Sequence, residues 1–507
     1  MSSEEIVLTT CPRDCYDGCG IAVVKRDGRI HRVIGDRTHP VSRGSLCGKC
    51  ALAYNGVWRD PAARLDSPLR RSGPKGSGQF EPLGWDEALA LIACKLGEAI
   101  ENYGATSVLH THYTGTCSTI AGEFPMRFFN RLGATEVSPD TICNNAGHVA
   151  LDYVLGSSLA GFDPKTHRDS RCLMIWGTNP SASAPHINKH WVGDSKACVV
   201  VIDPIRHDTA RMADIYLQPF PGSDAVLAFG LMHVILRDNL IDRMFIENHT
   251  IGWSELEALI TAIHLEWVSE ITGVPVQKIE QVAHVFAAGP SLMWLGQGLQ
   301  RQPQGGNVMR ACASLAAVTG NIGKPGAGIY YLNGSGPRKI DGDYVAAAHL
   351  GEKTQSSVSH MELVDVLDDP NRSQVLISWN MNVAASGPRQ AQLHQCLKRE
   401  DLFTVVIDLF QTDTADFADA TDITIFGEAD ALPTELDPEV IVFAVKPQQM
   451  DTVAPAYTRF AAGDCVFLSI AAGKTIGYFE EQLGTQAAVI RAMPNTPAAI
   501  GQGITVL

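Results

Sequence analysis

The sequence predicts an α/β protein with three parts: a small N-terminal domain with a β-hairpin, doubly wound Rossmann-like α/β domains, and a partial Rossmann-like α/β fragment. Three observations support this prediction. Four cysteines lie within the first 47 residues, around a stretch in which apolar and polar residues alternate. Between residues 57 and 420, apolar strand-like segments alternate with segments of helical periodicity. The same alternation continues through residues 421–507, where the motifs change.

The overall composition is that of a globular protein. The 507 residues are 45% hydrophobic and 19% charged, enough for about two to four domains with cores of their own. The net charge of −15 argues against binding to nucleic acid or to an anionic membrane surface. No apolar run approaches the roughly 18–20 residues that span a bilayer, so membrane insertion is not expected. The start, MSSEEIVLTT, lacks a secretory signal and predicts a cytoplasmic, reducing location.

The cysteine pattern near the N-terminus predicts a metal site. Cys11, Cys15 and Cys19 are each separated by three residues. Cys47 follows after the segment IAVVKRDGRIHRVIGD, which predicts a hairpin that turns at Asp27-Gly28. The hairpin would bring Cys47 back to the first three cysteines. Because soft thiolate ligands select iron–sulfur clusters or zinc over hard cations, the four cysteines are candidate ligands of an iron–sulfur cubane.

Two other uses of these cysteines have to be weighed. Structural zinc is the main competitor, but its usual ligand pairs have the spacing C-x2-C, which occurs here once, at Cys47 and Cys50. A disulfide framework is not expected, because the chain has an odd number of cysteines, thirteen, and no secretory signal. The spacing therefore favours the cluster.

The stretch from Cys11 to Cys50 resembles the N-terminal iron–sulfur domain of the molybdopterin oxidoreductases of the dimethyl sulfoxide reductase family. The motifs that carry the resemblance are C-P-x-D-C-x-x-x-C and G-D-x-x-H-P-x-x-R-G-x-L-C-x-K. The resemblance implies a 4Fe-4S domain over residues 1–56. In that family, the residue two after the last ligand is a lysine or arginine that lies between cluster and pterin, and Lys49 occupies this place.

Residues 57–420 contain a candidate for a separate metal site, Cys143. It lies in T-I-C-N-N-A-G just before a predicted helix, where the helix dipole favours a thiolate. Taken alone, a cysteine is more often a small buried packing residue. The family places its protein ligand of molybdenum or tungsten at this point, so the resemblance implies that Cys143 is the metal ligand. Earlier in this region, His110 and His112 alternate on the predicted strand ATSVLHTHY, where core histidines are more common than metal ligands.

Several loops in residues 57–420 follow predicted buried strands, which is where open α/β sheets bind ligands. Each loop alone is only a turn signal. Their order, and a segment similar to G-x-G-x-Q-R-x-x-x-G-G, resemble the family's sites for molybdopterin guanine dinucleotide. The resemblance also implies that two later strand–loop units, VLISWNMNVAAS and FTVVIDLFQTD, return to the first α/β layer. The cofactor-binding candidates are Gly177, Asn179, Asp203, Gly222, Asp224, Gly296, Gln300, Asn380 and Asp408.

Residues 421–507 resemble the middle of a pyrroline-5-carboxylate reductase, through A-V-K-P-Q, S-I-A-A-G and R-x-M-P-N-T-P. The segments EVIVFAV, CVFLSIA and AAVIRAM predict parallel strands. In that family, Lys446-Pro447 and Met493-Pro494-Asn495 would line the nicotinamide and substrate cleft. No G-x-G-x-x-G precedes the segment, so NAD(P)H binding is not expected. We interpret the chain as a fusion of two incomplete pieces, either natural or produced by an assembly or frame error.

The resemblance implies a molybdopterin-dependent oxidoreductase. Two-electron chemistry would take place at a molybdenum or tungsten bis-molybdopterin guanine dinucleotide centre, with electron transfer through the 4Fe-4S cluster. The implied partners are a small-molecule substrate and an electron-transfer protein or subunit. The family's C-terminal barrel, which closes over the pterins, is replaced by residues 421–507, so we expect an open cleft and reduced activity. Two alternatives stay open: a pterin-free iron–sulfur electron-transfer protein, and a pyrroline-5-carboxylate reductase.

Overall fold

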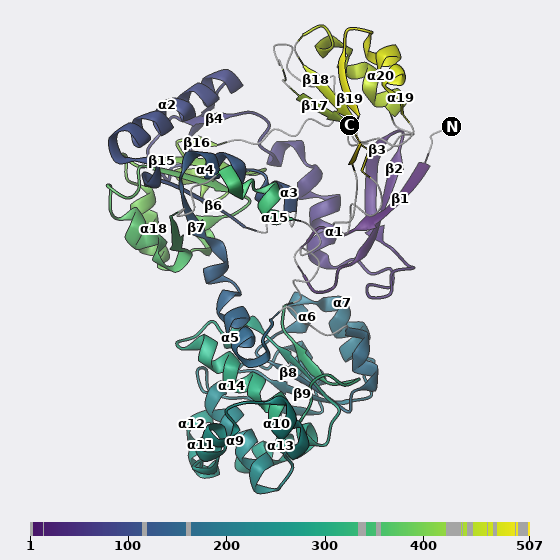
Figure 1. Ribbon diagram of the computed structural model, residues 1–507, viewed down its shortest axis with the longest axis vertical. Coiled ribbons are helices and arrows are strands. Elements are labelled where there is room, and N and C mark those ends of the chain that lie inside the picture. Colours follow the sequence, from purple (N-terminus) through teal and green to yellow (C-terminus); the bar gives the residue numbers. More distant parts are fainter. Residues whose placement is uncertain are drawn as a thin grey trace.

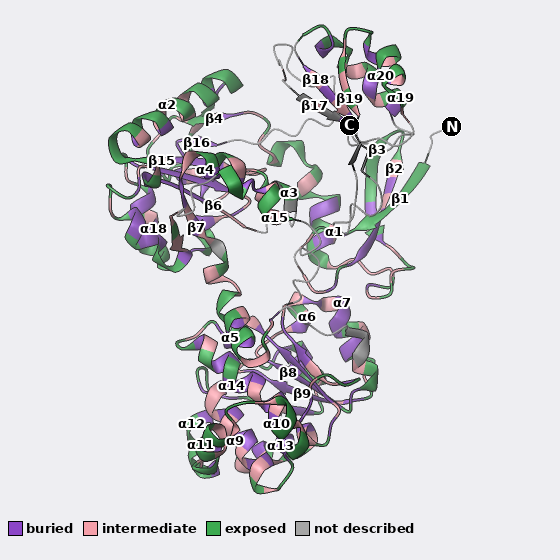
Figure 2. Ribbon diagram, viewed as in Figure 1, coloured by how far each residue is buried: buried purple, intermediate pink, exposed green. Residues whose placement is uncertain are grey.

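The computed structural model describes residues 4–13, 15–113, 119–158, 164–332, 341–350, 356–421, 438, 440–443, 450–463, 465–469, 474–491, 493–494 and 505–506. These residues form a small N-terminal sheet, two large α/β lobes and a small C-terminal sheet. Figure 1 shows the two lobes as separate bodies, with the N-terminal sheet beside them. Buried residues concentrate in the central strands of each lobe (Figure 2). The predicted α/β class is confirmed.

The N-terminal sheet has three antiparallel strands in the order β1-β2-β3. They are β1 (Glu4–Thr10), β2 (Gly20–Arg26) and β3 (Arg29–Gly35). The predicted hairpin is confirmed: its turn residues Asp27 and Gly28 have φ angles of +50° and +81°, the left-handed values that two-residue hairpins require. The outer strand β1 was not predicted. After the hairpin, the chain leads to α1 (Gly48–Asn55), whose N-cap is Cys47.

The first lobe contains an eight-stranded sheet in the order β13-β7-β6-β14-β15-β16-β4-β5. Its strands from β13 to β16 are parallel, whereas β4 and β5 pair antiparallel at one edge. The strands are β4 (Leu69–Arg71), β5 (Phe80–Pro82), β6 (Val108–His112), β7 (Thr135–Ser138), β13 (Ser357–Ser359), β14 (Val375–Trp379), β15 (Phe403–Ile407) and β16 (Ala420–Thr421). The helices are α2 (Trp85–Tyr103), α3 (Thr119–Glu123), α4 (Met126–Leu132), α15 (Gly342–Val345), α16 (Leu363–Leu367), α17 (Val383–Ser386) and α18 (Gln390–Leu397). Because β14 pairs with β6, the predicted return of the chain to its first layer is confirmed.

The second lobe contains a parallel five-stranded sheet in the order β10-β9-β8-β11-β12. The strands are β8 (Cys172–Trp176), β9 (Cys198–Ile202), β10 (Ile215–Leu217), β11 (Ser291–Leu295) and β12 (Gly328–Tyr330). The helices are α5 (Asn145–Leu155), α6 (Pro180–Ser183), α7 (Pro185–Ile187), α8 (Asp208–Met212), α9 (Asp224–Arg237), α10 (Arg243–His249), α11 (Trp253–Thr261), α12 (Leu265–Thr272), α13 (Val276–Ala287) and α14 (Gly305–Val318). Both faces of this sheet are covered: Met174 and Trp176 belong to one apolar core and Leu173 and Ile175 to another.

The C-terminal sheet consists of β17 (Val440–Phe443), β18 (Val466–Ser469) and β19 (Ala488–Arg491), which pair in parallel as predicted. Two helices, α19 (Met450–Val453) and α20 (Ile476–Leu483), accompany it, and β20 (Met493–Pro494) pairs antiparallel with β21 (Thr505–Val506). Lys446, Pro447 and Asn495, which the second resemblance singled out, lie outside the described residues. Within the described ranges, no helix combines the length and hydrophobicity that a membrane span requires.

The two strand histidines of the first lobe are packing residues in this fold. His110 is fully buried and stacks on Phe129 at 4.1 Å between ring centroids, and His112 stacks on Trp379 at 4.5 Å. Neither ring nitrogen of His110 has a hydrogen-bond partner among the described residues. Burial lowers the pKa of His110 to about 3 and that of His112 to about 4. Both rings are therefore neutral at neutral pH.

The buried His110 is expected to make the fold sensitive to acid. The unfolded chain takes up a proton on this ring near pH 6.5, whereas the folded chain does so only near pH 3. Between these values, His110 lowers the free energy of unfolding by about 1.4 kcal/mol for each pH unit of acidification. Urea unfolding at pH 7 and pH 4.5 measures how much the free energy of unfolding falls on acidification. This fall should be about 2–3 kcal/mol smaller in His110→Leu than in the wild type. In the control His264→Leu, which changes an exposed histidine, the free energy of unfolding should fall as much as in the wild type. An equal fall in all three proteins would contradict the prediction.

Candidate functional site

Five thiols converge where the N-terminal sheet meets α1. Cys11, Cys19 and Cys50 are buried, and Cys15 and Cys47 are partly buried. The Sγ atoms of Cys11 and Cys50 are 3.5 Å apart, and the Cys11 backbone N–H donates to the Cys19 carbonyl at 2.8 Å. All five cysteines are free thiols. Burial, followed by neighbouring negative groups, raises the pKa of Cys19 to about 12. Buried thiols become thiolates readily only when a cationic metal centre neutralises their charge. The donor set therefore fits an iron–sulfur cluster.

The cysteine loop is fixed to the second lobe by its two central residues. The Tyr16 ring packs edge-on against Trp294 and Tyr330, at 5.4 and 5.5 Å between centroids. The buried Asp17 carboxylate accepts the backbone N–H groups of His186 at 3.0 Å and Ile187 at 2.9 Å. These contacts join segments that are far apart in the sequence, which is why sequence patterns did not reveal them. They hold Cys15 and Cys19 in place relative to the five-stranded sheet.

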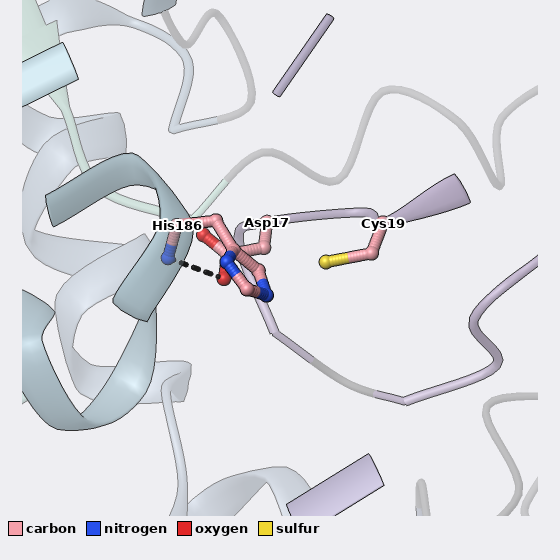
Figure 3. A group of neighbouring side chains, drawn as sticks. All are labelled: Asp17, Cys19 and His186. Carbon is pink, nitrogen blue, oxygen red and sulfur yellow. Dashed lines mark hydrogen bonds between the residues drawn. The ribbon is translucent and has the colours of Figure 1, made fainter. Parts of the chain in front are cut away.

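Figure 3 shows that the His186 ring lies between Asp17 and Cys19. One potential ligand atom from each of these three residues lies within 4.8 Å of the others. His186 is 5% exposed, and its Nε2 has no hydrogen-bond partner in the part of the chain that the structure describes. Burial lowers the pKa of His186. A neutral imidazole at this position can donate a hydrogen bond to the Cys19 sulfur, an interaction that tunes a thiolate ligand.

A cavity of about 890 Å³ adjoins the cysteine loop. It lies at the carboxyl ends of β8 and β11, between which the strand order of the five-stranded sheet reverses. Open α/β sheets bind ligands at this point. The loop after β8 contributes Gly177, Thr178 and Asn179, two of which were predicted cofactor contacts. The other lining residues are Cys15, Tyr16, Tyr113, Cys143, Asn144, His148, Ala182, Ser183, Gln297, Gly298, Arg301, Tyr330 and Leu332.

Cys143 is placed in this cavity by the chain segment that connects the two lobes. It follows a short turn, Pro139–Ile142, and directly precedes α5 and its N-cap Asn144, as the predicted helix start implied. Its Sγ lies 4.0 Å from Arg301 Nη2 and 3.9 Å from Gln297 Oε1. Arg301 also donates to Gln297 Oε1 at 2.7 Å. The thiol of Cys143 therefore has a positively charged neighbour that sequence analysis did not identify.

Lys49 connects α1 to the same cavity. Its exposed side chain donates from Nζ to the backbone carbonyl of Ala182 at 3.2 Å, and Ala182 belongs to the cavity wall. Lys49 therefore reaches from α1 to the cavity wall, and its place between cluster and pterin stays a prediction.

The family model for molybdopterin oxidoreductases matches residues 64–421, and that for the Fe4S4 domain of molybdopterin oxidoreductases matches residues 4–57. The chain belongs to the molybdopterin oxidoreductase family. Membership implies a 4Fe-4S cluster and a molybdenum or tungsten pterin as its cofactors. The convergent thiols and the adjoining cavity, with Cys143 in its wall, fit these groups.

Curated relatives and a solved structure agree with this membership. The chain is 35% identical over 426 residues to a probable oxidoreductase, YoaE, of Bacillus subtilis (strain 168), covering 82% of this chain and 61% of that protein. It is 28% identical over 476 residues to formate dehydrogenase H of Escherichia coli (strain K12), covering 85% of this chain and 64% of that protein. The structure of acetylene hydratase from Pelobacter acetylenicus matches its fold with a TM-score of 0.61 at 23% identity, over 82% of this chain and 60% of that one. The chain thus spans about three-fifths of the length of these proteins.

Two predicted pterin contacts, Gly296 and Gln300, do not line the cavity. They hold in place the loops that do. A Cβ on Gly296 would lie 2.0 Å from the carbonyl oxygen of Gly177, so the glycine allows the loops after β8 and β11 to touch. Gln300 is buried, accepts the Gly147 N–H at 2.6 Å and donates to the Cys143 carbonyl. It therefore fixes the backbone at Cys143 and in the first turn of α5.

The remaining predicted contacts lie outside the cavity lining. Asp203 accepts the Ile205 N–H at 2.8 Å, and burial raises the pKa of its carboxyl group. Asp224, beside Gly222 at the start of α9, accepts Trp176 Nε1–H at 2.8 Å and Gln302 Nε2–H at 3.2 Å. Two further predicted residues, Asn380 and Asp408, follow β14 and β15 in the other lobe.

Adjacent glycines at the start of α14 offer a test of how tightly this helix packs against its neighbours. A Cβ on Gly305 would lie 1.9 Å from the backbone oxygen of Gln300, whereas a Cβ on Gly306 would find its nearest atom, Ala146 O, at 3.6 Å. Gly305→Ala should lower the free energy of unfolding by about 1–3 kcal/mol, as overpacking usually does. The matched variant Gly306→Ala should be neutral or stabilising by up to about 1 kcal/mol, because alanine favours helices. Equal urea midpoints for the two variants would contradict this.

Proposed function

We propose that the chain carries the redox part of a molybdopterin-dependent oxidoreductase that performs two-electron chemistry on a small molecule. In this proposal, Cys11, Cys15, Cys19 and Cys47 hold the 4Fe-4S cluster and Cys143 binds molybdenum or tungsten. The observation that carries the proposal is that Cys15 and Cys143 line one cavity. When bound, these groups would supply two-electron redox chemistry at the metal and one-electron transfer at the cluster.

The protein's own groups would orient these cofactors. Arg301, 4.0 Å from the Cys143 sulfur, supplies positive charge beside an anionic ligand, and Gln300 holds the backbone of Cys143 in place. Lys49, which donates to the Ala182 carbonyl, would lie on the path of the electrons between cluster and pterin. Gly296 and Gln300 are the proposed pterin contacts. The proposed contacts to the guanine-dinucleotide arms are Gly177, Asn179, Asp203, Gly222 and Asp224. Asn380 and Asp408 would face the cofactor cleft from the other lobe.

Domain boundaries and a location complete the proposal. We place the 4Fe-4S domain at residues 1–56 and the pterin-binding α/β domains at residues 57–420. We assign residues 421–507 to a fused pyrroline-5-carboxylate reductase-like fragment that binds no nicotinamide cofactor; the end of the family match at residue 421 supports this boundary. Buried free thiols suit a reducing compartment, so we place the protein in the cytoplasm.

An electron-transfer partner is part of the proposed function. One protein similar to this chain, 29% identical over 439 residues, is the alpha subunit of an F420-dependent formate dehydrogenase from Methanococcus maripaludis. By analogy with such a subunit, we propose that a separate protein or subunit exchanges electrons with the cluster.

Metal and cofactor analysis of anaerobically purified protein tests the proposal. About four irons per chain, together with molybdenum or tungsten and guanine nucleotide, are expected. Iron without pterin or guanine nucleotide would instead support a pterin-free electron-transfer protein, and zinc without iron would overturn the cluster assignment.

A further inference from the structure

The cysteine site holds one thiol more than a cubane needs. A 4Fe-4S cluster binds one thiolate at each of its four irons, and Cys11, Cys15, Cys19 and Cys47 account for them. Cys50 is the fifth, and it is 5% exposed. A buried cysteine is often only a packing residue, so its position relative to the other thiols decides what it can do.

Cys50 faces the cluster site directly. Its Sγ is 3.5 Å from that of Cys11, and both sulfurs lie in one apolar cluster with Cys19. Tyr54, one turn further along α1, places its hydroxyl 2.9 Å from the Cys11 sulfur. Successive turns of α1 therefore present two side chains to Cys11, as the i, i+4 spacing on a helix allows.

Cys50 also shares its local setting with Cys47. Cys47 is the N-cap of α1 and Cys50 lies in its first turn, which holds no acidic residue. Both thiols therefore sit three residues apart at the start of the same helix, where i, i+3 side chains share one face. The Cys50 thiol contacts those of both Cys11 and Cys47.

We propose that Cys50 is an alternative fourth ligand that can replace Cys47 at the cluster. This inference rests on the proposed 4Fe-4S function. The exchange breaks the iron–sulfur bond to Cys47 and forms one to Cys50, and the departing thiolate takes up the proton that the incoming thiol releases. No electrons are gained or lost, so no oxidant or reductant is needed.

Anaerobic reconstitution with ferrous iron and sulfide tests the exchange by counting iron per chain. The proteins to compare are the wild type, Cys47→Ala, Cys50→Ala, the double variant, and the exposed-cysteine control Cys94→Ala. Each single variant should keep about four irons, as the wild type and the control do. The double variant should lose at least half. Far-UV circular dichroism confirms that each variant is folded, and electron paramagnetic resonance of the reduced cluster should differ between wild type and Cys47→Ala.

The outcomes separate this inference from the function on which it rests. If the wild type takes up no iron, the cluster assignment itself fails. If the wild type loads but folded Cys47→Ala binds as little iron as the double variant, Cys50 is a packing residue and the exchange is wrong. A double variant that loads as fully as Cys47→Ala would equally overturn it.

Discussion

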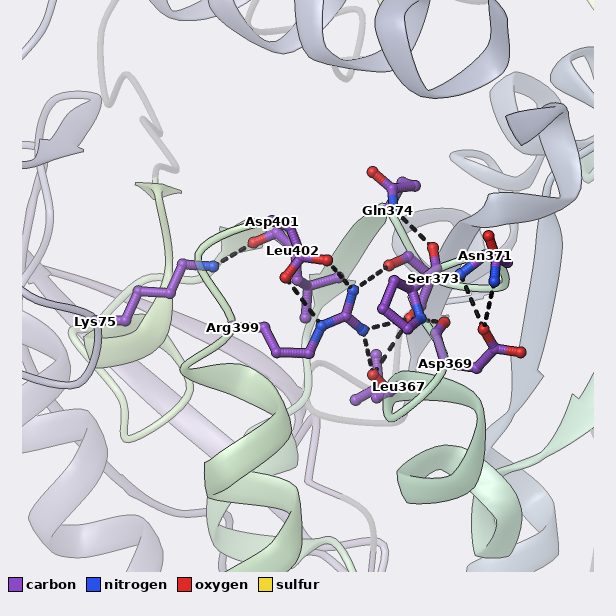
Figure 4. Close-up of polar contacts among 10 residues, drawn as sticks. Lys75, Leu367, Asp369, Asn371, Ser373, Gln374, Arg399, Asp401 and Leu402 are labelled. Carbon is purple, nitrogen blue, oxygen red and sulfur yellow. Dashed lines mark hydrogen bonds and ion pairs between the residues drawn. The ribbon is translucent and has the colours of Figure 1, made fainter. Parts of the chain in front are cut away.

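Asp419→Asn is expected to lower the free energy of unfolding by about 3–5 kcal/mol, the usual cost of breaking a buried ion pair from one side. The Asp419 carboxylate lies 2.8 Å from Lys75 Nζ and accepts from Arg71 Nε at 2.9 Å. The Lys75 side chain is 1% exposed, and burial lowers the pKa of its ammonium group. Its other partner is the Leu402 carbonyl, beside the Arg399 network shown in Figure 4. The substitution would therefore leave a buried positive charge without its anion.

A matched exposed pair provides the control. Arg70 and Glu81 form an ion pair of 2.6 Å on the neighbouring strands, but both side chains are nearly half exposed. Glu81→Gln should therefore change stability by less than about 1 kcal/mol. Urea unfolding of both variants checks the prediction, and an Asp419→Asn protein as stable as Glu81→Gln would refute the role of burial.

Cys15→Ala is expected to remove most of the iron from the protein. Cys15 lies on the loop after β1, whereas Cys50 lies in α1 three residues after Cys47, so Cys50 is placed to replace Cys47 and a cluster in this variant would be left with three cysteine ligands. Because thiolate ligation is what holds such a cluster, reconstituted iron should fall from about four per chain toward zero. Iron and sulfide assays measure the effect.

The control for this prediction is Cys198→Ala, another partly buried cysteine that lies on β9 and outside the cysteine site. It should bind as much iron as the wild type. Retention of a full cluster by a folded Cys15→Ala protein would remove Cys15 from the ligand set.

Local patterns were sufficient to predict much of this molecule. The turn at Asp27-Gly28, the helix that begins after Cys143, and the strands on either side of each loop follow from residue spacing and periodicity over short stretches. The juxtaposition of the Gly177 and Gly296 loops follows from the strand order of a doubly wound sheet.

Contacts between distant segments could not be predicted in this way. His186 beside Cys19, and Arg301 beside Cys143, are brought together only by the tertiary fold. His186 has no distinctive local pattern, and the motif that contains Arg301 does not show that its side chain reaches Cys143. Asp224 was predicted as a ligand contact. The periodicity of a strand does not reveal that its carboxylate instead accepts a hydrogen bond from Trp176 Nε1–H. The extra thiol, Cys50, was visible as one half of a C-x2-C pair, whose proximity to Cys11 required the fold.

One short loop has two tasks in this fold. Tyr16 docks on Trp294 and Tyr330 of the second lobe, while its neighbour Cys15 belongs both to the cysteine site and to the cavity wall. A substitution that frees Tyr16 from this aromatic contact would therefore disturb the thiol site and the wall of the cavity at the same time.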